Sequence, residues 1–280
     1  MSAGNLAAAA FGLASAASWG GGDFSGGFSA RHGSVLRVGP ISRLSGVAAQ
    51  VALALVFRES APSSASVLWA VAAGVSGSVG LMALYQSLAV GKMGVNSPLT
   101  AVLAASFPVV LGSVLQGVPS AVRLAGFALA LAGVWCLARP IGSTARPEGL
   151  GLAALAGLAF GGFYLMISQV RGPSVFWPLA VSTGTSFVVM IGLAAASGEA
   201  LRLPSGVLGI ALLAGALDAG GNACFVLAAH AGRVDVAAVL GSLYPAFTVL
   251  LARVVLRERL TRAQAAGLVA AIAALPLITA

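Results

Sequence analysis

Asp218 is a carboxylate inside an apolar stretch of the sequence. It lies near the middle of the predicted span 205–229, and Asn222 follows one helical turn later on the same helix face. An ionised carboxylate at the centre of a bilayer costs at least about 2.5 kcal/mol, even on insertion scales. We therefore expect Asp218 to face a cavity or a partner, with Asn222 beside it. The pair fits either a substrate site or a buried structural hydrogen bond.

A second carboxylate, Asp23, lies in the glycine-rich run GGGDFSGG at residues 20–27. Repeated glycines weaken a helix, and a broken helix exposes backbone groups that bind a carboxylate or an amine. The alternative is close helix packing through small residues such as Gly22 and Gly26. Gly22 and Gly26 are also candidate gate or hinge residues. If Asp23 lies at the cytoplasmic end of its helix, it is a gate residue and not a ligand.

Aromatic and uncharged polar residues on neighbouring apolar stretches complete the candidate substrate-binding site. Tryptophan and tyrosine supply apolar surface with a polar end, although they also form belts at membrane interfaces. Serine and threonine can instead hydrogen-bond within their own helix. The candidates, besides Asp23, Asp218 and Asn222, are Trp19, Tyr85, Gln86, Asn96, Ser97, Thr100, Tyr164, Ser242 and Tyr244.

Proton coupling and helix bending have their own candidate residues. His230 titrates near neutral pH and joins Asp23 and Asp218 as a possible proton carrier, although a single interfacial histidine is more often solvated. Proline removes an intrahelical hydrogen bond, so Pro108 and Pro245 predict hinges in two helices. We expect solvated interfacial charges at the carboxylates that fall in turns or at helix ends: Glu59, Glu148, Glu199, Asp235 and Glu258.

The residues that other chemistries require are missing from the sequence. It contains no GxxxxGK[ST] loop or dinucleotide fingerprint, so we expect no nucleotide and no other cofactor. Without an HExxH motif, a paired His/Cys cluster or GxSxG, we expect neither a metal site nor an enzyme. The basic residues stand singly between apolar runs, which argues against a nucleic-acid partner.

The composition indicates that lipid is the main solvent of the chain. The sequence is 59% hydrophobic and only 8% charged, with a mean hydropathy of +1.01. A soluble protein carries about a quarter of its residues as charged side chains. The chain is therefore predicted to be an integral membrane protein.

Ten stretches are long and apolar enough to be predicted as spans, because a crossing helix needs about 20 residues. Short turns that carry charges, proline or glycine separate them, so no soluble domain is inserted and the function must lie inside the bundle. The predicted spans are 5–26, 36–57, 66–90, 94–116, 121–139, 149–170, 175–197, 205–229, 234–256 and 262–279.

Basic residues favour one orientation of these spans. Eleven of the 15 lysines and arginines, Arg43 among them, are assigned to the turns after the odd-numbered spans, and four to the other turns. Cytoplasmic turns carry the excess of positive charge. We therefore expect both termini on the outer side of a bacterial-type plasma (inner) membrane.

The two halves of the chain align at a constant offset of 141 residues. Residues 11–24 then lie on residues 152–165, and residues 89–92 lie on residues 230–233. A repeat with five spans must enter the membrane from opposite sides in its two copies, which gives inverted topology. Such pairs recur in secondary transporters, where the substrate site lies between the repeats.

Residues 244–272 resemble the repeat signature of the drug/metabolite transporter superfamily, specifically its ten-span EamA-type exporters. The resemblance rests on Pro245, Glu258 and Gly267. The first half departs from the signature, since Gly117 stands where the equivalent of Glu258 would be. Within the superfamily the chain is similar to exporters of amino acids, including aromatic ones.

The resemblance implies a basket of ten helices around a central cavity. Spans 1, 3, 4, 6, 8 and 9 would line this cavity, and spans 5 and 10 would pack outside it.

Together these inferences predict an all-α integral membrane protein with ten transmembrane helices around a central cavity. Residues 1–140 and 141–280 would form two inverted-topology five-helix repeats. We expect a secondary transporter that exports amino acids or related small metabolites by alternating access. Efflux of hydrophobic drugs and a channel- or flippase-like permeation protein are the alternatives. The expected partners are a small-molecule substrate and the lipid bilayer, with the chain acting as a monomer or a homodimer.

Overall fold

A computed structural model describes residues 3–116, 120–137, 148–231, 240–241 and 243–279. This part of the chain is helical and contains no strand. Its helices are α1 (Ala3–His32), α2 (Val35–Val56), α3 (Ser64–Val90), α4 (Met93–Gln116), α5 (Ala121–Leu137), α6 (Leu150–Ile167), α7 (Phe176–Ala196), α8 (Ser205–Ala231), α10 (Tyr244–Val255) and α11 (Arg262–Thr279).

The helices follow the predicted spans closely, because the same apolar stretches that suit a bilayer also bury well against one another. The ninth predicted span, 234–256, is described mainly over α10, Tyr244–Val255. Asp235 and Ser242 lie outside the described residues. Among the described residues, five helices are long and apolar enough to cross a membrane: α2, α3, α6, α7 and the part of α8 at Ser205–Ala228.

The expected break in the first helix is absent, since α1 continues through the glycine run to His32. Neighbouring helices approach this run too closely for side chains. A Cβ at Gly20 would overlap the backbone of Tyr244, and one at Gly26 would overlap the ring of Tyr85. The glycines therefore serve helix packing, the alternative interpretation of the run.

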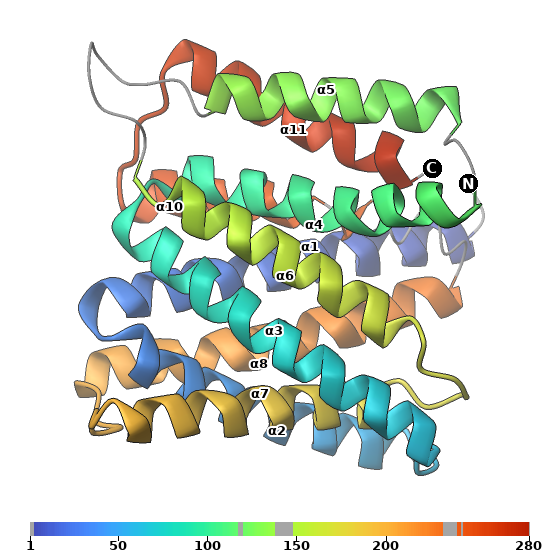
Figure 1. Ribbon diagram of the computed structural model, residues 1–280, viewed down its shortest axis with the longest axis vertical. Coiled ribbons are helices and arrows are strands. Elements are labelled where there is room, and N and C mark those ends of the chain that lie inside the picture. The colour runs from blue at the N-terminus through green and yellow to red at the C-terminus, as the bar shows by residue number, and fades with distance from the viewer. Residues whose placement is uncertain (1–2, 117–119, 138–147, 232–239, 242, 280) are drawn as a thin grey trace.

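Successive helices run in alternating directions, and the start of α1 and the end of α11 lie at the same end of the bundle (Figure 1). The helix α1 packs on α8 and α10, while α3 packs on α6 and α7. The helix α2 contacts both α7 and α8. The pair α5 and α11 forms one edge of the molecule (Figure 1).

Three helices end on the same local structure, a residue with positive φ followed by glutamate. The residues are Arg58 (φ 52°) before Glu59, Gly198 (φ 72°) before Glu199 and Arg257 (φ 55°) before Glu258. The reversed backbone stops each helix, much as an αL residue does at many helix C-termini. The glutamate that follows is then directed toward the start of another helix.

Two of these glutamates cap helix N-termini, where unpaired backbone N–H groups favour an anion. The Glu59 carboxylate accepts from the backbone N–H groups of Val175, Phe176 and Trp177 at the start of α7, at 2.8–3.1 Å. The Glu258 carboxylate accepts at 3.2 Å from Met93 and Gly94 at the start of α4. It also pairs with Arg31 at 3.0 Å.

The third glutamate, Glu199, lies at the start of α2. It pairs with Arg37 at 2.6 Å. Hydrogen bonds from Ser34 and Arg37 hold the pKa of Glu199 below its usual range. The expectation of merely solvated charges is therefore wrong for Glu59, Glu199 and Glu258, because each one links two segments distant in the sequence.

Candidate functional site

A cavity of about 170 Å³ lies inside the bundle, between helices from both halves of the chain. Its wall combines two aspartates, an arginine and uncharged polar groups with aromatic and aliphatic side chains. The polar residues are Asp23, Arg43, Gln50, Ser182, Thr183, Ser186, Asp218 and Asn222. The aromatic residues are Trp19, Phe160, Phe163, Tyr164 and Tyr244.

Arg43 and Asp218 form an ion pair across the cavity wall. The Arg43 Nη2 and Asp218 Oδ2 atoms are 3.4 Å apart, and the two side chains are 11% and 34% exposed. The pair joins α2 to α8. These helices approach closely at Gly215, which has no side chain; a Cβ there would overlap the carbonyl oxygen of Ser42. Arg43 is therefore an interior residue, and its assignment to a cytoplasmic turn is wrong.

Two polar atoms on α2 have no hydrogen-bond partner among the described residues. They are Nε of Arg43 and Oε1 of Gln50, both buried. Buried polar atoms are nearly always paired with protein or water, so these two atoms lack a partner that most buried polar atoms have. Arg43 therefore has donor capacity beyond its contact with Asp218.

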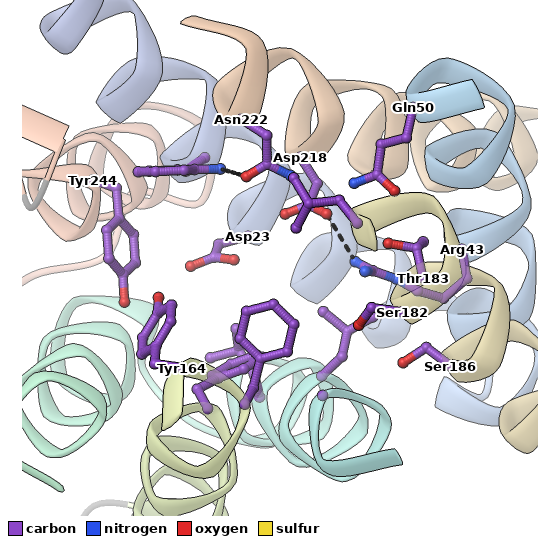
Figure 2. A pocket seen from close by; sticks show the side chains of 17 residues that line it. Asp23, Arg43, Gln50, Tyr164, Ser182, Thr183, Ser186, Asp218, Asn222 and Tyr244 are labelled. Carbon is purple, nitrogen blue, oxygen red and sulfur yellow. Dashed lines mark hydrogen bonds and ion pairs between the residues drawn. The ribbon is translucent and has the colours of Figure 1, made fainter. Parts of the chain in front are cut away.

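Asp23 extends from α1 into the cavity, as Figure 2 shows. Among the residues drawn there it makes no hydrogen bond or ion pair. With Asp23, Asp218 and Arg43 all ionised, the cavity carries one more negative than positive charge. Asp23 is thus the carboxylate whose charge no neighbouring cation in the cavity pairs with.

Aromatic rings form much of the remaining wall. The Trp19 indole N–H donates to Asn222 Oδ1 at 3.2 Å, and the Trp19 ring meets Tyr244 edge-on with centroids 6.5 Å apart. On α6, Phe163 and Tyr164 also meet edge-on, with centroids 5.5 Å apart. Tyr164 keeps 46% of its surface exposed. These rings offer apolar surface in the same cavity as the charged groups.

The structure brings six of the predicted substrate-binding residues to this cavity: Trp19, Asp23, Tyr164, Asp218, Asn222 and Tyr244. These residues lie on α1, α6, α8 and α10, so segments distant in the sequence meet at one site. Their contact with a substrate stays a prediction.

Five other candidates do not line the cavity. Asn96 Nδ2 donates to the carbonyls of Ser87 and Glu148 at 2.8 and 3.1 Å. Thr100 donates to the carbonyl of Ala153 at 3.0 Å. All three bonds tie α4 to neighbouring segments: α3, the turn before α6, and α6 itself. Ser97 is buried on α4, Tyr85 lies 3.2 Å from Ser42 through its hydroxyl, and Gln86 is half-buried outside the cavity.

The cavity also includes helices that the family resemblance did not imply. Gln50 and Arg43 come from α2, while Ser182, Thr183 and Ser186 come from α7; α4 contributes no lining residue among those described. A single arginine inside an apolar stretch was the available signal for Arg43, since such a charge needs a partner.

The proposed hinge and proton-coupling residues lie in different settings. Pro245 occupies the first turn of α10, where a missing N–H breaks no helical hydrogen bond. Pro245 therefore does not kink the interior of α10, and a hinge at this position stays a prediction. Pro108 falls within the bounds of α4, and its side chain is outside the described part of the chain. Gly22 and Gly26 lie in helix contacts. His230 is exposed at the end of α8.

The second half of the chain matches a known protein family. Residues 147–280 match the model of the EamA-like transporter family. This half belongs to the EamA-like transporter family. Its helices α6, α7, α8 and α10 supply more than half of the cavity wall residues. This family consists of membrane transporters of small molecules, so more than half of the cavity wall comes from a half of that kind.

A solved crystal structure shares the fold of the entire chain. It superposes with a TM-score of 0.61, covering 97% of this chain and 96% of that chain at 18% sequence identity. The EamA-like half and the half before it therefore together follow a known helical fold. No curated protein matches the sequence.

Proposed function

We propose that the protein is a secondary transporter that exports amino acids or related small metabolites through the central cavity. The observation that carries this proposal is an EamA-like half that shares a charged, aromatic-walled cavity with the preceding half. The lipid bilayer is its environment, and a small organic molecule is its substrate.

Charge and size favour small polar metabolites over drugs. The wall holds two carboxylates and a guanidinium, which suit ammonium and carboxylate groups on one ligand. The volume of about 170 Å³ is below the 300–1,000 Å³, roughly, of pockets for drug-sized ligands. The aromatic wall is the feature that would favour hydrophobic-drug efflux instead.

We further propose two inverted repeats that alternate access to the cavity. At the 141-residue offset, four cavity residues of the first half align with cavity residues of the second half. The aligned pairs are Trp19 and Phe160, Asp23 and Tyr164, Gly77 and Asp218, and Leu81 and Asn222. Helix contacts repeat in the same way. The contact of α1 with α8 corresponds to that of α6 with α3, and α2 with α8 to α7 with α3.

The proposed orientation retains both termini on the outer side of a plasma (inner) membrane. The turns after α1, α3, α7 and α10 lie at the end of the bundle opposite the start of α1 (Figure 1). Without the interior Arg43, the basic residues still divide ten against four in favour of the turns after odd-numbered spans. Positive charge on that side favours it as cytoplasmic.

Proton coupling is proposed through Asp23, with Asp218 as its nearest acidic neighbour in the cavity. An unpaired carboxylate can exchange a proton without first breaking an ion pair. His230 is the weaker candidate, because it is exposed at a helix end away from these groups.

Counterflow and uptake in proteoliposomes test the function, using a panel of amino acids and drugs with and without a pH gradient. We expect saturable amino-acid flux, at least tenfold lower in Asp23→Asn when the pH gradient drives it. Glu148→Gln removes an exposed carboxylate outside the cavity and should retain the wild-type rate. Drug flux without amino-acid flux would favour efflux of hydrophobic drugs instead. No flux of any solute would overturn the proposal that the protein is a transporter.

A further inference from the structure

The charged groups of the cavity are concentrated on one side of the duplicated framework. Asp23 and Asp218 lie on α1 and α8, which pack on each other. At the repeat offset their counterparts on α6 and α3 are Tyr164 and Gly77, which carry no charge. The side of the cavity formed by α1, α2 and α8 is therefore ionic, with Trp19 also on it, and the side formed by α3 and α6 is aromatic and apolar.

The ionic side offers one site for each sign of charge. Asp23 is the carboxylate without a partner among the cavity residues drawn in Figure 2. Arg43 has a buried Nε without an acceptor in the described part of the chain, and its contact with Asp218 is long at 3.4 Å. A guanidinium can bind one carboxylate and still donate to a second, since it has five N–H groups.

The apolar side lies next to these groups. Phe160, Phe163 and Tyr164 extend from one face of α6 into the cavity. Aromatic rings bury apolar ligand surface and stack on other rings. A ligand that spans the cavity would thus need a charged head and an apolar tail.

We propose that the cavity binds an α-amino acid zwitterion with a large apolar or aromatic side chain in one defined orientation. The ligand carboxylate binds Arg43, the ammonium binds Asp23, and the side chain packs against the aromatic residues of α6. Asp218 orients Arg43 and balances part of its charge while the site is empty. This inference rests on the proposed function and adds a role for Arg43 as the residue that selects for the carboxylate.

Three ligands that differ by one charged group test the orientation. Phenylalanine carries both groups, 2-phenylethylamine lacks the carboxylate, and 3-phenylpropionate lacks the ammonium. Isothermal titration of the purified full chain gives a Kd for each, independently of transport. We expect wild-type protein to bind phenylalanine at least tenfold more tightly than either analogue.

Single substitutions then identify each contact. Arg43→Gln should weaken phenylalanine at least tenfold while leaving 2-phenylethylamine as tight or tighter, because the cavity becomes more negative. Asp23→Asn should weaken phenylalanine and 2-phenylethylamine while leaving 3-phenylpropionate as tight or tighter. Arg171→Gln, at an exposed arginine outside the cavity, should change none of the three.

Several results would overturn the orientation. Wild-type protein that binds either analogue as tightly as phenylalanine has a simple cation or anion site. Equal losses for all three ligands in Arg43→Gln would give Arg43 a purely structural role. If none of the three binds while other amino acids are still transported, the proposed orientation fails and the proposed function stands. If no solute is transported, the proposed function fails, whatever the three ligands bind.

Discussion

Arg43 shows how one residue changes the interpretation of a cavity. Because Arg43 lies beside Asp218 in the cavity wall, the wall carries both a positive charge and negative charges, and not carboxylates alone. Within the pair, each partner lowers the cost of burying the other. Its two partners differ in exposure, 11% for Arg43 and 34% for Asp218, so their removal should have unequal effects.

We predict that Asp218→Asn destabilises the protein more than Arg43→Gln. Losing Asp218 removes the carboxylate that Arg43 contacts and leaves Asp23 as the remaining carboxylate in the cavity wall, at a cost toward the lower end of about 3–5 kcal/mol for broken buried pairs. Losing Arg43 leaves a partly exposed carboxylate that water can reach. Thermal unfolding in detergent measures both, and the double variant should recover part of the loss. Additive losses in the double variant would contradict this coupling.

Sequence reasoning at the residue scale succeeded where chemistry alone decides and failed where packing decides. Asp23, Asp218 and Asn222 were found because interior polar groups are costly wherever they lie in a span. Asn96 and Thr100 are equally polar, yet Asn96 bonds to α3 and Thr100 bonds to α6 outside the cavity. A single sequence cannot say which face of a helix meets the cavity.

At the scale of elements, glutamate after a reversed backbone residue connects helices that are distant in the sequence. Glu59 follows α2 and caps α7, while Glu199 follows α7 and pairs with Arg37 near the start of α2. The two connections are reciprocal, at opposite ends of one helix pair. They fix the position of α2, which carries Arg43.

Glu59→Ala should therefore destabilise the protein by about 1–2 kcal/mol, the range for a lost helix N-cap with an added charge–dipole contribution. Three backbone N–H groups lose their acceptor at the start of α7. The stability of Glu59→Gln should fall between those of the wild type and Glu59→Ala, since the amide oxygen still accepts hydrogen bonds. Thermal unfolding is the measurement, with Glu148→Ala as the matched exposed control. Equal stability of Glu59→Ala and the control would contradict the cap.

Helix positions were predictable because bilayer thickness sets the length of an apolar stretch and charged turns set its ends. The continuity of α1 was not, since glycine propensity favours a break. Contacts of Gly20 and Gly26 with neighbouring helices outweigh that propensity. Pro245 likewise begins α10 and does not bend a helix interior.

At the scale of the whole molecule, the proposed repeats would contribute two dissimilar copies of one wall to a single cavity. At the 141-residue offset, Asp23 aligns with Tyr164 and Asp218 aligns with Gly77, and all four residues line the cavity. Divergence of this kind would give the proposed symmetric scaffold an asymmetric site. The central claim of the account is that substrate occupies this site.

Substrate protection of a cysteine in the cavity wall tests that claim most directly. Leu179 is half-buried on α7 and lines the cavity. After Cys136 and Cys224 are replaced by alanine, Leu179→Cys is labelled with a small maleimide, beside Ser168→Cys at an exposed helix end as control. We predict that a saturating transported amino acid slows labelling at position 179 at least fivefold and leaves position 168 unchanged. Equal labelling rates at position 179 with and without that amino acid would contradict the account.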